Sequence, residues 1–162
     1  MTTIKKEIAV FAAGCFWGVE ESFRLKPGVI KTTVGYTGGH TTSPTYEQVC
    51  SGATGHTEAV HIEYDPQEIS YKALLDIFWS THNPTEYHRQ GLDIGSQYRS
   101  EIFYSTEKQK VEAYDSKKAL EERQVHKKPV VTEITKLDVF YPAEEYHQKY
   151  LLKKGAATCR VL

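Results

Sequence analysis

The residues best suited to chemistry are Cys15 and its immediate neighbours. Cys15 lies in Gly14-Cys15-Phe16-Trp17-Gly18, between an apolar run at 8–13, typical of a buried strand, and a stretch at 19–23 that favours a helix. In the first turn of a helix, unpaired backbone N–H groups and the helix dipole lower the pKa of a thiol. The residues alone therefore leave two interpretations: a reactive thiolate, and a buried, unreactive cysteine, which is the commoner fate.

Further motifs follow the Cys15 motif along the chain. They are Val34-Gly35-Tyr36-Thr37-Gly38-Gly39, Pro44-Thr45-Tyr46-Glu47-Gln48-Val49-Cys50, Gly55-His56-Thr57-Glu58-Ala59-Val60, Gly95-Ser96-Gln97-Tyr98-Arg99-Ser100 and Phe140-Tyr141-Pro142-Ala143-Glu144. In this order the sequence resembles the A-type peptide methionine sulfoxide reductases over residues 14–144. The resemblance implies a repair enzyme that reduces the S epimer of methionine sulfoxide, free or in proteins, and a ferredoxin-like fold.

Reduction of a methyl sulfoxide requires a nucleophile, a proton for the leaving oxygen and a surface that holds the methyl group. Cys15 can supply the nucleophile. Phe16 and Trp17 can hold the methyl group on their aromatic faces, with core packing as the alternative role. Glu58 can supply the proton if burial raises its pKa. The sequence alone favours a solvent-facing carboxylate for Glu58. The family resemblance favours a catalytic role instead, because Gly55-His56-Thr57-Glu58 matches the motif of the family's catalytic glutamate.

The resemblance also implies how substrate is bound. Tyr46 and Tyr98 match the two tyrosines that hydrogen-bond the sulfoxide oxygen in the family, and Asp93 matches its pocket aspartate. Without the resemblance, each tyrosine would be interpreted as packing.

After the first step Cys15 would be a sulfenic acid, which a second thiol resolves to a disulfide. Cys159 is the expected resolving cysteine, because it follows the last predicted helix in a tail without a packing pattern, and thioredoxin is the expected reductant. The tail departs from the glycine-rich pattern of many family members. Cys50 competes for this role, although we favour a buried small hydrophobe at that position. External thiols that resolve Cys15 directly are a further alternative.

Alternating strands and helices must position these residues. Apolar periodicity, turn residues and capping signals predict strands near 7–13, 29–35, 57–65, 98–104 and 130–134, and helices near 15–25, 44–52, 71–82, 106–123 and 143–153. The expected caps are Ser43 for the second helix, Ser70 for the third, and a capping box at Thr106-Glu107-Lys108-Gln109 for the fourth. Residues 83–97 read as a long polar loop. This order predicts an α+β two-layer sandwich with a mixed sheet, a ferredoxin-like core (split βαβ), a C-terminal helix and a coiled tail.

Composition sets the remaining limits. With 162 residues and a formal net charge of −1, we expect one catalytic domain over 1–162 that binds no nucleic acid. No apolar run reaches membrane-spanning length and no signal peptide opens the chain, so we expect a cytoplasmic protein. We also expect a monomer. Three cysteines without a CxxC pair favour neither a disulfide framework nor a zinc site. No metal or organic cofactor is implied.

Two other classes of function remain as alternatives. A cysteine hydrolase acting through a thioester would need a histidine base, and no histidine lies in a recognisable hydrolase pattern. A non-enzymatic module could instead bind oxidised or methylated side chains in an aromatic cage.

Overall fold

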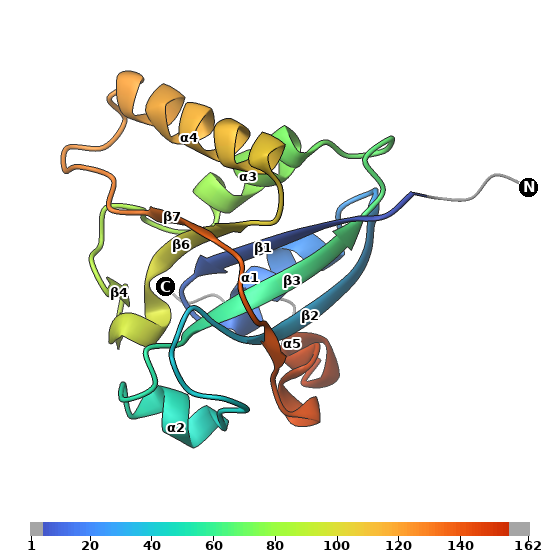
Figure 1. Cartoon of the computed structure of the whole chain (residues 1–162), viewed down its shortest axis with the longest axis vertical. Coiled ribbons are helices and arrows are strands. Elements are labelled where there is room, and N and C mark those ends of the chain that lie inside the picture. Colours follow the sequence, from blue (N-terminus) through green and yellow to red (C-terminus); the bar gives the residue numbers. More distant parts are fainter. Residues whose placement is uncertain (1–4, 156–162) are drawn as a thin grey trace, which may run out of the picture.

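The structure, a computed structural model, describes residues 5–155 and is built on a six-stranded sheet (Figure 1). The strands are β1 (Glu7–Ala13), β2 (Val29–Thr37), β3 (Thr57–Tyr64), β4 (Arg89–Gln90), β5 (Asp93–Ile94), β6 (Ser100–Tyr104), β7 (Glu133–Lys136) and β8 (Tyr141–Pro142). The helices are α1 (Phe16–Arg24), α2 (Tyr46–Cys50), α3 (Tyr71–Ser80), α4 (Glu107–Glu122) and α5 (Tyr150–Lys153), with short 3₁₀ turns η1 (Ser96–Tyr98) and η2 (Glu145–His147).

The strand order confirms the predicted α+β class and its split βαβ core. The sheet runs β7-β6-β1-β3-β2-β8, so β3 lies between β1 and β2, and both flank it antiparallel. β6 pairs antiparallel with β1, whereas β7 pairs parallel with β6, which makes the sheet mixed. The hairpin of β4 and β5 forms a separate small sheet.

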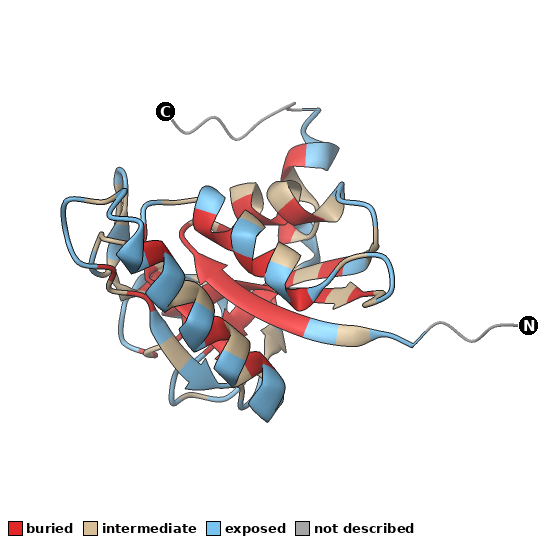
Figure 2. Cartoon of the chain, turned by 90° about the horizontal axis from the view of Figure 1, so that it is seen from above, coloured by how far each residue is buried: buried red, intermediate tan, exposed pale blue. Residues whose placement is uncertain are grey.

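β1 is buried on both faces, which is why it reads as a continuous apolar run (Figure 2). Phe11 on one face packs against aromatic rings of α1 and α3, with centroids 5.5 Å from Phe23 and 5.1 Å from Phe78. On the other face, Val10 and Ala12 join a smaller cluster with Ala59 and Phe103. Leu137 and Phe140, after β7, pack on that cluster.

Most helix boundaries agree with the expectations to within two residues. Ser70 caps α3 as predicted, its side chain accepting the Ala73 N–H at 3.0 Å. Thr106 likewise caps α4 through Gln109 N–H. The predicted capping box is only half formed there, because the Gln109 side chain accepts from Ser105 N–H instead.

Four expectations need correction. The cap of α2 is Thr45, in a capping box with Gln48, and not Ser43. The strand predicted at 130–134 lies at Glu133–Lys136, where it pairs with β6. The loop predicted at 83–97 contains the β4–β5 hairpin and the first two residues of η1. The helix predicted at 143–153 is divided into η2 and α5 by Lys149, whose φ of 51° is left-handed.

Within residues 5–155, no helix has both the length and the apolar character needed to cross a membrane.

Candidate active site

One end of the sheet gathers those predicted site residues that the structure describes. Because β1 and β3 are antiparallel, Cys15, two residues after the end of β1, lies at the same end as Glu58 near the start of β3. β6 also runs antiparallel to β1, so η1, which carries Tyr98, meets this end as well. β2 finishes here and leads through a loop to Tyr46, the first residue of α2.

Cys15 is the N-cap residue of α1, as the strand-to-helix pattern predicts. Its carbonyl accepts the Val19 N–H at 3.4 Å, and its side chain is partly exposed. The preceding Gly14 has a φ of 98°, which glycine adopts readily, and a Cβ there would lie 3.0 Å from carbons of the Gln90 side chain. The cysteine is therefore held at the first turn of α1, where helix N–H groups favour negative charge.

Glu58 is buried beside this turn. Its side chain is 1% exposed, and its Oε1 accepts the backbone N–H of Phe16 at 3.0 Å. Burial raises the pKa of Glu58 to about 8, an effect that the Phe16 hydrogen bond opposes and the Asp93 charge reinforces. The carboxyl is therefore mostly protonated at neutral pH. Since Oε1 accepts from Phe16, the proton belongs on Oε2.

Tyr46, Tyr98 and Asp93 converge on the same place. Burial raises the pKa of both tyrosines, and the charge of Glu58 reinforces the shift in each. Asp93 acts electrostatically on Glu58 and on Tyr98, and the Cys15 thiolate acts on Tyr98. The two phenols thus remain protonated hydrogen-bond donors at neutral pH.

The two aromatic residues after Cys15 have different environments. Phe16 is 1% exposed and belongs to the main core, with its ring centroid 5.8 Å from Tyr36 and 6.5 Å from Tyr46. Trp17 is only partly buried, and its indole stacks on the Tyr150 ring with centroids 3.8 Å apart and planes 9° from parallel. Phe16 therefore combines core packing with a position in the site, whereas Trp17 keeps an accessible part.

His147 is a site residue that the sequence reasoning missed. It is fully buried, with its ring centroid 5.2 Å from Phe16 and 4.4 Å from Tyr46. Its Nδ1 accepts the Trp17 Nε1–H at 2.9 Å. Burial lowers the pKa of His147, which favours the neutral ring, and because Nδ1 accepts from Trp17 the proton lies on Nε2. That Nε2 is buried and has no hydrogen-bond partner among residues 5–155.

Glu144 was also missed as an individual residue, although it ends one of the recognised motifs. Its carboxylate accepts the Tyr36 hydroxyl at 2.8 Å and the Tyr46 backbone N–H at 2.9 Å. Backbone and side-chain hydrogen bonds hold the pKa of Glu144 below its ordinary value despite partial burial. Glu144 therefore fixes the start of α2, and with it Tyr46, against β2.

The other two cysteines have different outcomes. Cys50, at the end of α2, is exposed, so the favoured interpretation of a buried small hydrophobe is wrong. Its thiol shares a hydrogen bond with the Tyr46 side chain, and desolvation raises its pKa, with the Glu58 charge adding to the shift. Cys159 lies outside the described residues.

His56 and His61 make contacts that stabilise the fold. His56 Nδ1 accepts the Gly39 N–H at 3.0 Å, so Nε2 donates to the Thr41 carbonyl at 2.8 Å. His61 packs against Phe140 with ring centroids 5.2 Å apart. In the described part of the chain, no three His, Cys, Asp or Glu side chains gather in a metal-binding arrangement.

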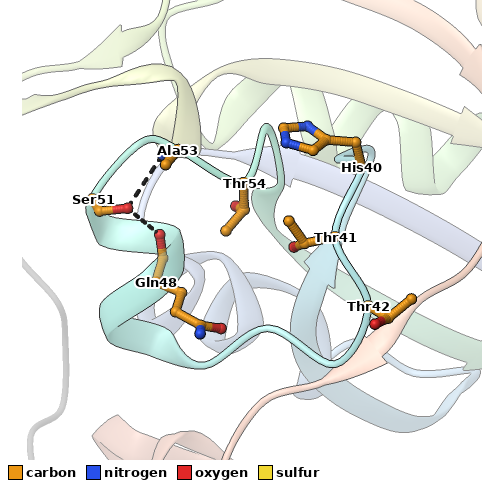
Figure 3. Close-up of a pocket in the computed structure, with 7 residues that line it drawn as sticks. All are labelled: His40, Thr41, Thr42, Gln48, Ser51, Ala53 and Thr54. Carbon is orange, nitrogen blue, oxygen red and sulfur yellow. Dashed lines mark hydrogen bonds between the residues drawn. The ribbon is translucent and has the colours of Figure 1, made fainter.

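A polar pocket of about 560 Å³ lies between α2 and the loop at 40–42 (Figure 3). None of the predicted site residues lines it. Its wall is held in part by Ser51, whose Oγ donates to the Gln48 carbonyl at 2.6 Å and accepts the Ala53 N–H at 3.2 Å. The lining residues are His40, Thr41, Thr42, Gln48, Ser51, Ala53 and Thr54.

Comparisons with known proteins agree with this arrangement. A family sequence model described as "Peptide methionine sulfoxide reductase" matches residues 7–162. The peptide methionine sulfoxide reductase MsrA of Methanosarcina acetivorans is 58% identical over 149 residues, which are 92% of this chain and 79% of that protein. Reduced Mxr1 from Saccharomyces cerevisiae has a similar structure, with a TM-score of 0.89 and 33% identity over 98% of this chain and 92% of that chain. Mxr1 in complex with Trx2 matches with a TM-score of 0.64 and 25% identity over 92% of this chain and 87% of that chain. The chain therefore belongs to the peptide methionine sulfoxide reductase A family, as its motifs predict.

Proposed function

We propose that Cys15 reduces the S epimer of methionine sulfoxide, free or within proteins, with Glu58 as the proton donor. The observation that carries this proposal is the 3.0 Å hydrogen bond from Phe16 N–H to Glu58 Oε1. It ties a buried carboxyl, with a pKa raised to about 8, to the residue next to the cysteine. A carboxyl that is protonated at neutral pH can act as a general acid beside a thiolate.

The first step transfers oxygen from substrate to enzyme. The Cys15 thiolate attacks the sulfoxide sulfur while Oε2 of Glu58 gives its proton to the sulfoxide oxygen. The oxygen ends on Cys15 as a sulfenic acid, and the substrate sulfur is released as the thioether of methionine. Cys15 is oxidised by two electrons, and the sulfoxide is reduced by two.

The surrounding side chains have separate roles in this step. Phe16 and Trp17 hold the S-methyl group, since sulfur and methyl groups pack well on aromatic faces. The hydroxyls of Tyr46 and Tyr98 donate hydrogen bonds to the sulfoxide oxygen, and their raised pKa values keep them protonated. Asp93 binds the substrate beside them, and its charge favours the protonated form of Glu58.

The second step returns the enzyme to its reduced form. A thiol condenses with the Cys15 sulfenic acid to give a disulfide and water, and Cys159 is the proposed thiol. Cys50 remains the competitor, because its sulfur acts electrostatically on Tyr98, as Cys15 does. A thioredoxin dithiol then reduces the disulfide by exchange. The similarity to Mxr1 in complex with Trx2 supports this choice of reductant.

The reaction is tested with the two separated epimers of methionine sulfoxide and dithiothreitol as reductant. We expect release of methionine from the S epimer, little from the R epimer, and none from either with the Cys15→Ser protein. Equal reduction of both epimers would contradict the proposed stereochemistry. Ester hydrolysis without sulfoxide turnover would instead favour a cysteine hydrolase, and sulfoxide reduction by Cys15→Ser would exclude Cys15 as the nucleophile.

A further inference from the structure

A second buried carboxylate, Glu20, lies on α1 and takes no part in the proposed reaction. Its side chain is 1% exposed. Its Oε2 accepts the Thr32 hydroxyl at 2.7 Å, and its Oε1 accepts the backbone N–H of Lys149 at 2.8 Å. Burial raises the pKa of Glu20, whereas both hydrogen bonds and the charge of Lys149 favour the ionised form. A buried carboxylate is costly, so its partners must hold it in place.

Lys149, the backbone partner of Glu20, adopts an uncommon conformation. Its φ of 51° and ψ of 43° are left-handed, which is unfavourable for a residue with a Cβ. Such a residue persists only when the surrounding structure holds it. Lys149 separates η2 from α5, so its conformation sets the direction in which the chain turns between His147 and Tyr150.

His147 and Tyr150 are the two residues that hold Trp17. His147 accepts the indole N–H at 2.9 Å, and the Tyr150 ring stacks on the indole at 3.8 Å. Glu20 and Trp17 are three residues apart on α1 and therefore share one face of the helix. Glu20 thus binds the backbone of segment 147–150 at the point between the two side chains that contact Trp17.

We propose that Glu20 is a positioning residue that fixes the indole of Trp17 through the Lys149 turn. The carboxylate does not touch the substrate. It holds Lys149 in the left-handed conformation, so that His147 and Tyr150 lie against Trp17 and keep the indole oriented toward the S-methyl group. The functional part of this inference rests on the proposed role of Trp17, whereas the structural part does not.

The structural part is tested by NMR of the indole N–H of Trp17, with Trp79→Phe to assign the two tryptophan signals. We expect Glu20→Leu to shift the Trp17 signal and Glu20→Gln, which keeps an acceptor for Lys149 N–H, to leave it near its wild-type position. Glu21→Leu is the matched control, because Glu21 lies on the same helix and pairs with Arg24. An unchanged Trp17 signal in Glu20→Leu overturns the proposal.

The functional part is tested by the kinetics of methionine S-sulfoxide reduction. The indole of Trp17 contacts the S-methyl group equally in the substrate and in the transition state. Loss of this contact therefore raises KM and leaves kcat nearly unchanged. We expect Glu20→Leu to raise KM on the order of tenfold, equivalent to about 1.4 kcal/mol, with Glu20→Gln close to wild type. Equal losses in both variants, or a loss of kcat at unchanged KM, contradict a positioning role. A wild-type protein without turnover would refute the proposed reaction and leave the NMR result standing.

A rescue variant and a wild-type measurement cover the case in which Glu20→Leu folds poorly. Glycine adopts a left-handed φ at little cost, so Lys149→Gly in the Glu20→Leu background should restore part of the KM and of the indole signal. In the wild-type protein, hydrogen exchange of the Lys149 amide should be as slow as in the strands. A fast-exchanging Lys149 amide overturns the proposal without any variant.

Discussion

At the scale of single residues, the balance of effects on Glu58 decides the chemistry. The hydrogen bond from Phe16 N–H stabilises the carboxylate, as the positive end of α1 would also do. Burial opposes this and is the larger effect, so the pKa rises from 4.5 to about 8. The N-terminal turn of α1 therefore favours the thiolate form of Cys15, whereas burial keeps the neighbouring carboxyl of Glu58 protonated.

Replacement of Glu58 by glutamine tests this assignment. Glutamine keeps a hydrogen-bond donor of similar size but has no proton to transfer, so single-turnover reduction should slow by about 10²–10⁴-fold. Both proteins share the pH dependence that comes from ionisation of Cys15. The ratio of the wild-type rate to the Glu58→Gln rate therefore reports the protonation of Glu58 alone. This ratio should be large at neutral pH and fall as the pH rises through about 8, where Glu58 loses its proton. A ratio that does not depend on pH would contradict the assignment.

The stability of the protein should report the same pKa independently of activity. Between pH 4.5 and about 8 the folded protein binds more protons at Glu58 than the unfolded chain does, so its free energy of unfolding falls as pH rises. A tenfold difference between the folded and unfolded acid dissociation constants corresponds to about 1.4 kcal/mol. Glu58→Gln lacks this loss, so its Tm relative to wild type should be higher at pH 8.5 than at pH 5. An equal difference at both pH values would argue against the raised pKa.

At the scale of elements, the loop after β2 is tied to the start of β3, which carries Glu58. His56 binds Gly39 N–H and the Thr41 carbonyl, and Thr54 accepts the His40 N–H at 2.9 Å. Gly39 lies so close to the segment just before β3 that a Cβ would overlap the His56 backbone nitrogen and the Thr54 carbonyl oxygen. The close approach of two backbones, and not a positive φ, therefore requires glycine there.

Gly39→Ala should consequently destabilise the protein and slow reduction together. We expect a loss of about 1–3 kcal/mol, or a Tm lower by roughly 3–10 °C for a chain of this size, because backbone atoms must move apart. Gly52→Ala is the matched control. Its φ of 80° brings strain, but nothing lies within 4 Å of the added Cβ, so it should cost less and leave the rate unchanged. Equal effects of the two substitutions would show that the close contact of Gly39 with Thr54 and His56 is unimportant.

The elements that sequence reasoning predicted well are those whose pattern and caps are local. The observed β1 agrees with its prediction because burial on both faces gives a continuous apolar run. The observed α3 agrees because the cap residue Ser70 and the apolar face of the helix indicate the same starting point. The prediction of one C-terminal helix was wrong because Lys149, whose N–H donates to the distant Glu20 carboxylate, adopts a left-handed conformation between η2 and α5. The strand near residue 130 was misplaced because its position depends on pairing with β6.

Some residues of the candidate site could likewise be identified from local sequence, and others could not. Cys15 could be found from its local strand-to-helix position, whereas Glu58 needed the family resemblance, because nothing local shows that it is buried. His147 was missed because its contact with Trp17 joins residues 130 positions apart. No periodicity in a single sequence encodes such a pairing.

At the scale of the whole molecule, the antiparallel sheet explains why residues from distant parts of the chain meet. β1, β2, β3 and β6 all begin or end at one end of the sheet, and the site is built from residues in or next to those strand ends. The segment after β8 closes the arrangement, since Glu144 binds Tyr36 and Tyr46 and His147 binds Trp17. The chain beyond α5 leads to Cys159.

The identity of the resolving thiol is a prediction about the whole chain. One equivalent of methionine S-sulfoxide without reductant should give a Cys15–Cys159 disulfide, which peptide mapping detects. Cys159→Ser should keep the first turnover and lose repeated turnover with thioredoxin, and Cys50→Ser should keep both. A Cys15–Cys50 disulfide, or reduced Cys159 beside oxidised Cys15, would exclude Cys159.

The most direct test of the central claim is a single turnover of a protein in which Cys15 is the sole cysteine. The Cys50→Ser/Cys159→Ser variant is mixed with one equivalent of methionine S-sulfoxide, and methionine and the oxidation state of Cys15 are measured together. The account predicts one methionine per protein and an equal amount of Cys15 sulfenic acid, trapped with dimedone and identified by mass spectrometry. Methionine released while Cys15 remains a thiol, or no methionine at all, would contradict it.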